Sequence, residues 1–245
     1  MAAVLSQLGD RWREPRIYNR LSRWFWCGVL GELYGGAVET RIANDFEELL
    51  PWLVSTPAES MQDPSDGLPR TISDAAFQES RLDTLRSRVS AAYKGLNVLV
   101  LREGAEDFFW KDTIQALSYE EMALDIHHIF PRAWCQENGL KRSVYDSVVN
   151  KTPISFKANR MISRLKAPSK YLAALQSHSQ AKMTDNDMNR ILSTHRIPFA
   201  PLRSDDFESF YTSRKNALIA LVENAIGKSV QRDQSYDEIT LEAAI

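Results

Sequence analysis

The sequences DIHHIFP, residues 125–131, and NKTPISFKANR, residues 150–160, decide the fold that we expect for this chain. The first is a compact apolar run rich in isoleucine and bounded by a proline, which predicts a strand that carries two neighbouring histidines. The second predicts a strand over 148–155 and then a helix over 156–166 that stops before a proline. We therefore expect a small strand–strand–helix unit in the middle of the chain.

Helical patterns lie on both sides of this unit. One buried stripe is predicted near the N-terminus and a second after a Gly-Gly pair, and they consist of Tyr18, Leu21, Trp24 and Phe25, and of Val38, Ile42, Phe46 and Leu49. A longer helix is expected over 73–101, with Ser73 as its N-cap. Shorter helices are expected over 131–141, 169–176, 184–194 and 205–226. The chain is therefore predicted to be mainly α.

Three regions are expected along the chain. Residues 1–100 form a helical region with a loop or linker near 55–73, where prolines and small polar residues gather. Residues 101–175 hold the strand–strand–helix unit. Residues 176–245 form C-terminal helices that pack on that unit, and the polar tail after about residue 229 is expected to fray.

Composition excludes several classes of protein. The chain is 44% hydrophobic and 25% charged, which is ordinary for a globular protein. Its two cysteines, Cys27 and Cys135, cannot form a CxxC pair or a four-ligand zinc site, so we expect two reduced, buried thiols. The longest uncharged apolar run near the N-terminus, 24–31, is too short to span a bilayer, and no basic segment introduces a signal peptide. We expect a cytoplasmic protein without a membrane partner.

Charge is distributed unevenly. The net charge is −2, yet residues 125–172 contain nine Lys/Arg against three Asp/Glu. A basic island in an acidic chain suits a localised site for a polyanion. A solvated helical face rich in Lys and Arg is the competing interpretation, and charge alone favours neither.

The neighbouring histidines suggest hydrolytic chemistry. Cleavage of a phosphodiester needs a neutral imidazole to deprotonate water and a metal ligand close by. Adjacent residues in a strand point to opposite faces, so His127 and His128 could divide these two tasks on a curved hairpin. The dipeptide by itself favours two structural histidines; the asparagines downstream, Asn150 and Asn159, shift the balance.

With these asparagines, with Asp125 three residues before His128, and with the sequence KAPSKYL at 166–172, the segment resembles the HNH (ββα-metal, His-Me finger) nuclease family. It is most similar to the C-terminal effector domain of GmrSD-like and SspE-like modification-dependent restriction proteins. The resemblance implies a mainly α fold with a small embedded ββα-metal (HNH) hairpin-plus-helix motif. It is specific over 125–172, although weaker likeness extends over most of the chain.

The same resemblance implies a role for each residue. His128 would be the general base, and His127 and Asn159 would bind one divalent metal. Asn150 would support catalysis by bonding loop backbone, and Asp125 would orient a histidine or a metal-bound water, or else cap the structure. The metal would be Mg²⁺ or Mn²⁺, and the imidazole of His127, in a position where many members have an acid, also admits Ni²⁺ or Zn²⁺.

Basic side chains beside the motif are candidate contacts to the phosphate backbone of DNA. They are Lys157, Arg160, Arg164 and Lys166, each of which would by itself be interpreted as a solvated side chain.

Other histidines and tryptophans are expected to be structural. His178 and His195 are interpreted as helix C-caps or surface residues. Trp12, Trp24 and Trp26 are interpreted as core residues.

These inferences lead to an expected function. The chain would be a metal-dependent endonuclease that nicks DNA in an anti-phage restriction system. The alternatives are a catalytically weak nucleic-acid-binding or interaction module, and an RNA-directed nuclease. No G-x-x-x-x-G-K-[ST] loop occurs, so any NTP-hydrolysing sensor would belong to another domain or subunit. The chain would then cut without NTP and without recognising modified bases.

Overall fold

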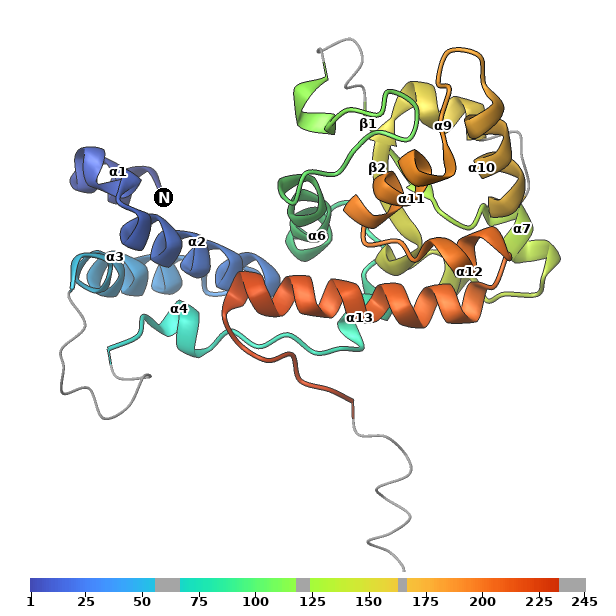
Figure 1. The fold of residues 1–245 in the computed structure, drawn as a ribbon. Helices are drawn as coiled ribbons and strands as arrows, with labels where there is room; N and C mark the ends of the chain where they lie inside the picture. The colour runs from blue at the N-terminus through green and yellow to red at the C-terminus, as the bar shows by residue number, and fades with distance from the viewer. Residues whose placement is uncertain (56–66, 118–123, 163–166, 234–245) are drawn as a thin grey trace, which may run out of the picture. The chain divides into compact units, whose positions relative to one another are not determined.

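The computed structural model describes residues 1–55, 67–117, 124–162 and 167–233. Within these ranges the chain is mainly helical and contains a two-stranded antiparallel sheet (Figure 1), which confirms the predicted mainly α class. None of the described helices is long and apolar enough to cross a membrane.

Backbone contacts divide the chain into two compact units. The first comprises 1–78 and 222–245, and the second comprises 79–221. The boundaries expected at residues 100 and 175 fall inside the second unit.

The first unit is built from helices near the N-terminus. They are α1 (Ala2–Leu8), the 3₁₀ helix η1 (Gly9–Arg13), α2 (Pro15–Leu30), α3 (Val38–Val54) and α4 (Arg70–Ser73). Pro15 begins α2, where a proline lacks no hydrogen bond because the first N–H groups of a helix are free. The end of the described chain returns to this unit, because Val230 is buried and the Gln231 amide donates to Phe77 O at 2.9 Å.

The predicted buried stripes of this unit are partly wrong. In α2, Leu21 and Trp24 are buried as expected, but Tyr18 and Phe25 are 52% and 42% exposed. In α3 only Leu49 of the predicted stripe is buried, while Ile42 and Phe46 are 56% and 55% exposed. Val38 is exposed as well.

A buried carboxylate explains why α3 turns a different face inward. Asp45 accepts hydrogen bonds from Trp24 Nε1 at 2.9 Å, from Thr71 Oγ1 at 2.7 Å and from the Tyr34 hydroxyl. A buried carboxylate needs such partners, and facing α2 and α4 is how Asp45 obtains them. Ile42 and Phe46 instead line a cavity of about 340 Å³ in this unit.

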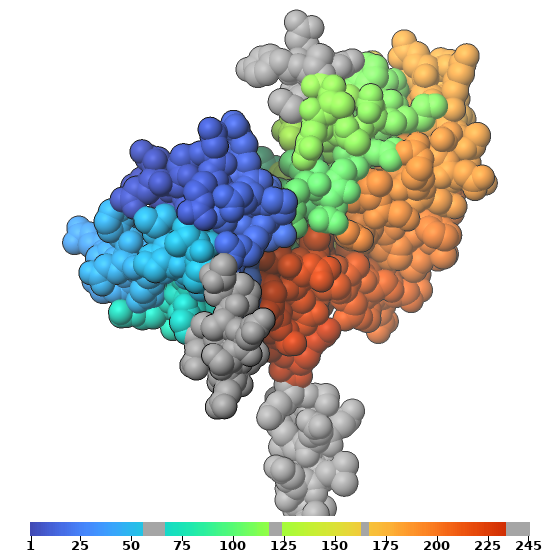
Figure 2. Space-filling model, turned by 60° about the vertical axis from the view of Figure 1, so that its left-hand side comes forward, coloured from blue at the N-terminus to red at the C-terminus, as the bar shows by residue number. Residues whose placement is uncertain are grey.

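The second unit holds the sheet and the remaining helices. In chain order they are α5 (Arg81–Thr84), α6 (Ala91–Arg102), η2 (Ile114–Ala116), β1 (Leu124–His128), α7 (Arg132–Glu137), α8 (Arg142–Tyr145), η3 (Val148–Asn150), β2 (Lys151–Ser155), α9 (Phe156–Ile162), α10 (Pro168–Ser177), α11 (Asp185–Thr194), α12 (Phe199–Arg203) and α13 (Phe207–Ile226). In Figure 2 the orange residues of this unit adjoin its orange-red residues, those closer to the C-terminus, on the surface. The last residues of α13, from Val222, belong to the first unit.

The strand–strand–helix order predicted for the middle of the chain is present. β1 and β2 pair antiparallel, with His127 opposite Thr152 and His128 opposite Lys151. α9 follows β2 directly and buries Ala158 and Ile162. Aromatic and aliphatic side chains close the core around this unit, including Phe108, Phe130, Ile154, Tyr171, Leu172, Leu192 and Phe210.

The single helix predicted over 73–101 is wrong, because α4 ends at Ser73 and two separate helices, α5 and α6, follow it in this region. Leu85 leaves the helical conformation, with φ −71° and ψ 103°, and its carbonyl accepts from the Val148 amide at 2.8 Å. Ser90 then caps α6 by accepting from the Tyr93 amide. Ser73 is the last residue of α4 rather than an N-cap. A tertiary hydrogen bond has overridden a favourable local pattern.

The expectations for cysteine and tryptophan are largely confirmed. Cys27 and Cys135 are free and fully buried. Trp24 and Trp26 are buried, whereas Trp12 is half-buried and stacks beside the Arg13 guanidinium.

Candidate metal and general-base site

The two histidines of β1 bond partners on different elements. Successive side chains of a strand point to opposite faces, so Asp125 and His127 share one face of β1 and His128 lies on the other. α9 packs against the first face, where it presents Asn159. The second face meets Asp146, at the end of α8. The alternation of side chains along a strand predicts this separation of the two histidines.

Three of the predicted site residues form a continuous chain of hydrogen bonds. His127 Nδ1 lies 3.1 Å from Asn159 Oδ1. Asn159 Nδ2 donates to Asp125 Oδ2 at 3.0 Å. His127 is buried, while Asp125 and Asn159 are half-buried, so this chain leads from the protein interior to the surface. The structure thus brings together the residues predicted for the metal.

Burial keeps the imidazole of His127 neutral. Loss of hydration lowers its pKa to about 3, and the hydrogen bond with Asn159 opposes this only in part. A neutral ring is the form that can bind a metal. Its other nitrogen, Nε2, is buried without a hydrogen-bond partner among the described residues, and the ring lies perpendicular to that of Tyr171, with centroids 5.6 Å apart.

His127, Asn159 and Asp125 are the residues that could hold one small divalent cation, provided that His127 Nδ1 gives up the proton with which it now bonds Asn159 Oδ1. Neighbouring ligands with metal bonds of about 2.1 Å lie roughly 3 Å apart, close to the 3.1 Å between His127 Nδ1 and Asn159 Oδ1. Asp125 adds a carboxylate beside them. In the part of the chain that the structure describes, no group of three His, Cys, Asp or Glu side chains could hold a metal. A cation here would therefore depend on the carbonyl oxygen of Asn159.

On the opposite face His128 belongs to a cluster of polar and charged side chains around Asp146. Its Nε2 lies 3.0 Å from Asp146 Oδ1, and the same oxygen accepts from Lys151 Nζ at 2.7 Å. Arg142 Nε is 3.5 Å from Asp146 Oδ2. The His128 side chain is 27% exposed, whereas Lys151 is buried at 7%.

These contacts set the charge state of each group. Partial burial by itself would raise the pKa of Asp146, but the hydrogen bonds and charges of Lys151 and His128 outweigh it and lower the pKa to about 2. Burial lowers the pKa of His128, although the hydrogen bond with Asp146 opposes the change. At neutral pH the cluster therefore contains an ionised Asp146 and a neutral His128.

Asn150 bonds loop backbone, as predicted from the sequence. Its Oδ1 accepts from the Phe130 amide at 2.8 Å, and its Nδ2 donates to Phe130 O at 3.0 Å and to Tyr145 O at 2.9 Å. The side chain is fully buried. It joins the segment after β1 to the end of α8, and so positions the strand that carries the histidines.

Two of the four residues predicted to contact phosphate lie in the described part of the chain. Lys157 and Arg160 are exposed on α9. Lys157 lies over the Phe109 ring and Arg160 over the Phe156 ring, at 5.2 and 4.8 Å from the centroids. Arg164 and Lys166 lie outside the described residues. The first two residues lie on the helix that carries Asn159.

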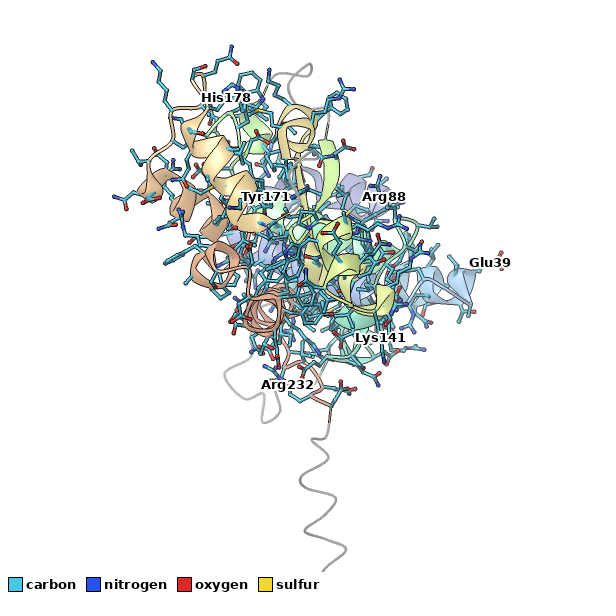
Figure 3. The ribbon with its side chains drawn as sticks, turned by 90° about the vertical axis from the view of Figure 1, so that its right-hand side faces the viewer. Glu39, Arg88, Lys141, Tyr171, His178 and Arg232 are labelled. Atoms are coloured by element: carbon cyan, nitrogen blue, oxygen red, sulfur yellow. The ribbon has the colours of Figure 1, made fainter. Side chains whose placement is uncertain are left out.

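Buried polar residues that were not singled out from the sequence support the site. Asp107, fully buried, accepts from the Ser155 amide at 2.7 Å and so anchors the end of β2. Arg214 of α13 is also buried, and it donates to Lys151 O at 2.8 Å and to His195 O at 3.3 Å. Tyr171, labelled in Figure 3, donates its hydroxyl to Ile129 O at 2.9 Å.

The two remaining histidines are C-caps, which was one of the two roles predicted for them. His178 follows α10 and His195 follows α11. The surface alternative is wrong for His195, which is fully buried. Its Nε2 lies 2.7 Å from Glu106 O and must therefore donate, which leaves Nδ1 to accept from Thr152 Oγ1 at 2.7 Å.

Asp146 is the partner that sequence reasoning missed. One signal was present: it is among only three acidic residues within 125–172, the basic island. Asp146 follows His128 by 18 residues, and no sequence motif links the two positions.

Comparison with known proteins gives one relative. The uncharacterized protein MJ0686 of Methanocaldococcus jannaschii is 30% identical over 196 residues, which cover 77% of this chain and 32% of the relative. The chain thus spans about a third of the length of that protein. No protein-family model matches the chain. No solved structure matches it.

Proposed function

We propose that this chain is a metal-dependent HNH endonuclease that hydrolyses phosphodiester bonds in DNA. The observation that carries the proposal is that the two adjacent histidines of β1 bond different partners on opposite faces of the strand. His127 meets Asn159 and Asp125 on one face, and His128 meets Asp146 on the other. A metal ligand and a neutral imidazole on adjacent residues are the two groups that this hydrolysis needs.

His128 acts as the general base. Burial keeps the ring neutral at pH 7, which leaves one nitrogen free to accept a proton from water. Its partial exposure, 27%, allows water to reach the ring. Asn150 keeps the following backbone in place through three buried hydrogen bonds.

His127 and Asn159 would hold one divalent metal, with Asp125 beside them. The cation, Mg²⁺ or Mn²⁺, would stabilise charge on the phosphate and on the leaving oxygen. The imidazole ligand extends the range to Ni²⁺ and Zn²⁺. Asp125 also orients the Asn159 amide by accepting from Nδ2, so that Oδ1 faces His127.

Lys157 and Arg160 would contact the phosphate backbone. Both extend from the helix that carries Asn159, and the Lys157 ammonium and the Arg160 guanidinium each lie over an aromatic ring. Such packing limits the side-chain entropy that is lost when a phosphate binds. Arg164 and Lys166 are proposed for the same surface on sequence grounds alone.

The biological setting is also a proposal. A single HNH site cuts one strand, so nicking is the expected activity, in a cytoplasmic anti-phage restriction system. A sensor or NTP-hydrolysing domain or subunit would supply recognition of modified DNA.

A supercoiled-plasmid assay tests the activity. Purified protein is incubated with Mg²⁺, Mn²⁺, Ni²⁺ or EDTA, and conversion to open circle is followed. His128→Ala should slow nicking by about 10²- to 10⁴-fold, the usual contribution of a general base. Asn159→Ala should raise the metal concentration needed for half-maximal rate. The matched control is His178→Ala, which removes a C-cap histidine outside the site and should cleave like wild type.

Several outcomes would overturn parts of the proposal. Equal nicking by wild type and His128→Ala would exclude the base, and cleavage that survives EDTA would exclude the metal. Retarded migration of DNA without cleavage would favour a binding module with little catalysis. Cleavage of labelled RNA in preference to plasmid would assign the enzyme to RNA.

A further inference from the structure

The contacts of Asp146 determine which nitrogen of His128 is free. Asp146 Oδ1 lies within hydrogen-bond distance of both His128 Nε2, at 3.0 Å, and Lys151 Nζ, at 2.7 Å. An ionised carboxylate can only accept hydrogen bonds, so Nε2 must carry a proton and donate to Asp146 Oδ1. Among the described residues no group bonds Nδ1 of this ring.

We propose that Asp146 is a positioning residue that holds His128 in the Nε2–H tautomer and thereby makes Nδ1 the atom that accepts the proton of the attacking water. This inference rests on the proposed nuclease function, which it deepens. A carboxylate that orients a base in this way also stabilises the imidazolium that forms when the base takes up a proton.

The proton and electron balance is simple. Water gives a proton to Nδ1 while its oxygen forms a bond to phosphorus. The electron pair of the breaking P–O bond leaves with the sugar oxygen, which takes up a proton from solvent. Asp146 keeps its hydrogen bond to Nε2–H throughout, and His128 returns its extra proton to solvent.

Lys151 has a separate part in this arrangement. It is buried at 7%, it lies over the Tyr93 ring at 5.6 Å, and its ammonium shares Oδ1 of Asp146 with His128. Its charge keeps Asp146 ionised, which the tautomer requires. A purely structural role for Asp146 would consist of neutralising this lysine and nothing more.

The tautomer can be measured directly. Long-range ¹H–¹⁵N correlation spectra at pH 8 distinguish protonated from unprotonated ring nitrogens, and the chain has only four histidines to assign. In the wild type, His128 should show a protonated Nε2 and an unprotonated Nδ1. Asp146→Ala removes the acceptor, and Asp146→Asn keeps its shape without the charge. Both should give a mixture of tautomers at His128.

Asp83→Asn is the matched control. Asp83 accepts from Lys215 Nζ at 2.8 Å and from the Tyr211 hydroxyl at 2.7 Å, so its substitution also breaks a lysine ion pair in the second unit. It should leave the His128 spectrum unchanged. In the nicking assay the Asp146 variants should lower kcat by about 10- to 100-fold, less than the roughly 10²- to 10⁴-fold expected for loss of the base itself, with KM changed less than about threefold. Asp146→Glu should recover part of kcat.

Each result has a defined meaning. A wild-type His128 with its proton on Nδ1 would overturn the inference, and so would Asp146→Ala and Asp146→Asn spectra identical to wild type. Unchanged kcat in both variants would overturn the catalytic part while His128→Ala remains inactive. If wild type cleaves no nucleic acid, the proposed function fails, and with it Nδ1 as proton acceptor. The spectra still decide whether Asp146 sets the tautomer.

Discussion

Substitution of Asn150 by alanine should remove more stability than any other asparagine substitution in this region. The Asn150 amide makes three fully buried hydrogen bonds, two with the Phe130 backbone and one with Tyr145 O. A net hydrogen bond contributes about 1 kcal/mol, and each buried group left without a partner costs about 1–3 kcal/mol. Because three backbone groups would lose their partner, we expect a loss of about 3–5 kcal/mol.

The assay is urea unfolding followed by circular dichroism, with each transition fitted separately because the chain forms two compact units. Hydrogen exchange at the Phe130 amide provides a local measurement and should speed up strongly. Asn138→Ala is the control. Asn138 donates one exposed hydrogen bond, to Trp134 O at 2.9 Å, and its loss should change stability by less than about 0.5 kcal/mol.

A loss below about 1 kcal/mol for Asn150→Ala, or one equal to that of Asn138→Ala, would refute this reasoning. It would mean that the segment after β1 relaxes enough to satisfy its own backbone. Unchanged exchange at Phe130 would lead to the same conclusion.

Three further predictions concern other parts of the second unit. Burial lowers the pKa of His195 to about 4, so between pH 6.5 and 4 the unfolded chain binds a proton that the folded chain does not. The free energy of unfolding should therefore be highest above pH 6.5 and fall by about 1.4 kcal/mol per pH unit as the pH drops toward 4. Urea midpoints measured across this range should decline less steeply for His195→Gln than for the wild type. Lys157→Ala and Arg160→Ala should each lower the slope of log affinity against log salt by about one, measured by fluorescence anisotropy on DNA; an unchanged slope would place these charges away from the phosphates. Ser90→Ala removes the N-cap of α6 and should destabilise the protein by about 1 kcal/mol in thermal unfolding, and no change would show that the cap is dispensable.

Local patterns explain why the middle of the chain could be predicted. The apolar run of β1 and the face of α9 that carries Ala158 and Ile162 have periods that suit one kind of element each. Alternation along a strand also predicts that His127 and His128 lie on opposite faces of β1. The helix predicted over 156–166 contained Asn159, which lies on α9 as expected, but the strand predicted over 148–155 contained Asn150, which the structure places in η3 before β2.

The N-terminal helices show where local patterns fall short. Apolar residues at helical spacing could be grouped into more than one stripe, and the one chosen for α3 contained Ile42 and Phe46. The structure turns that helix so that Asp45 meets Trp24 and Thr71. A single buried carboxylate, with its need for donors, thus decided which face lies inward.

By itself the sequence determined a mainly helical chain, a central pair of strands followed by a helix, and the histidines and asparagines of a candidate site. Periodicity and turn residues act between near neighbours, so the sequence suffices for these features. Only the tertiary structure placed Asp146 beside His128 and Arg214 beneath β2. The first contact joins residues that are 18 positions apart in the sequence, and the second joins residues that are 63 positions apart. A charged side chain away from water selects its partners by geometry and desolvation, and neither produces a periodic pattern in the sequence.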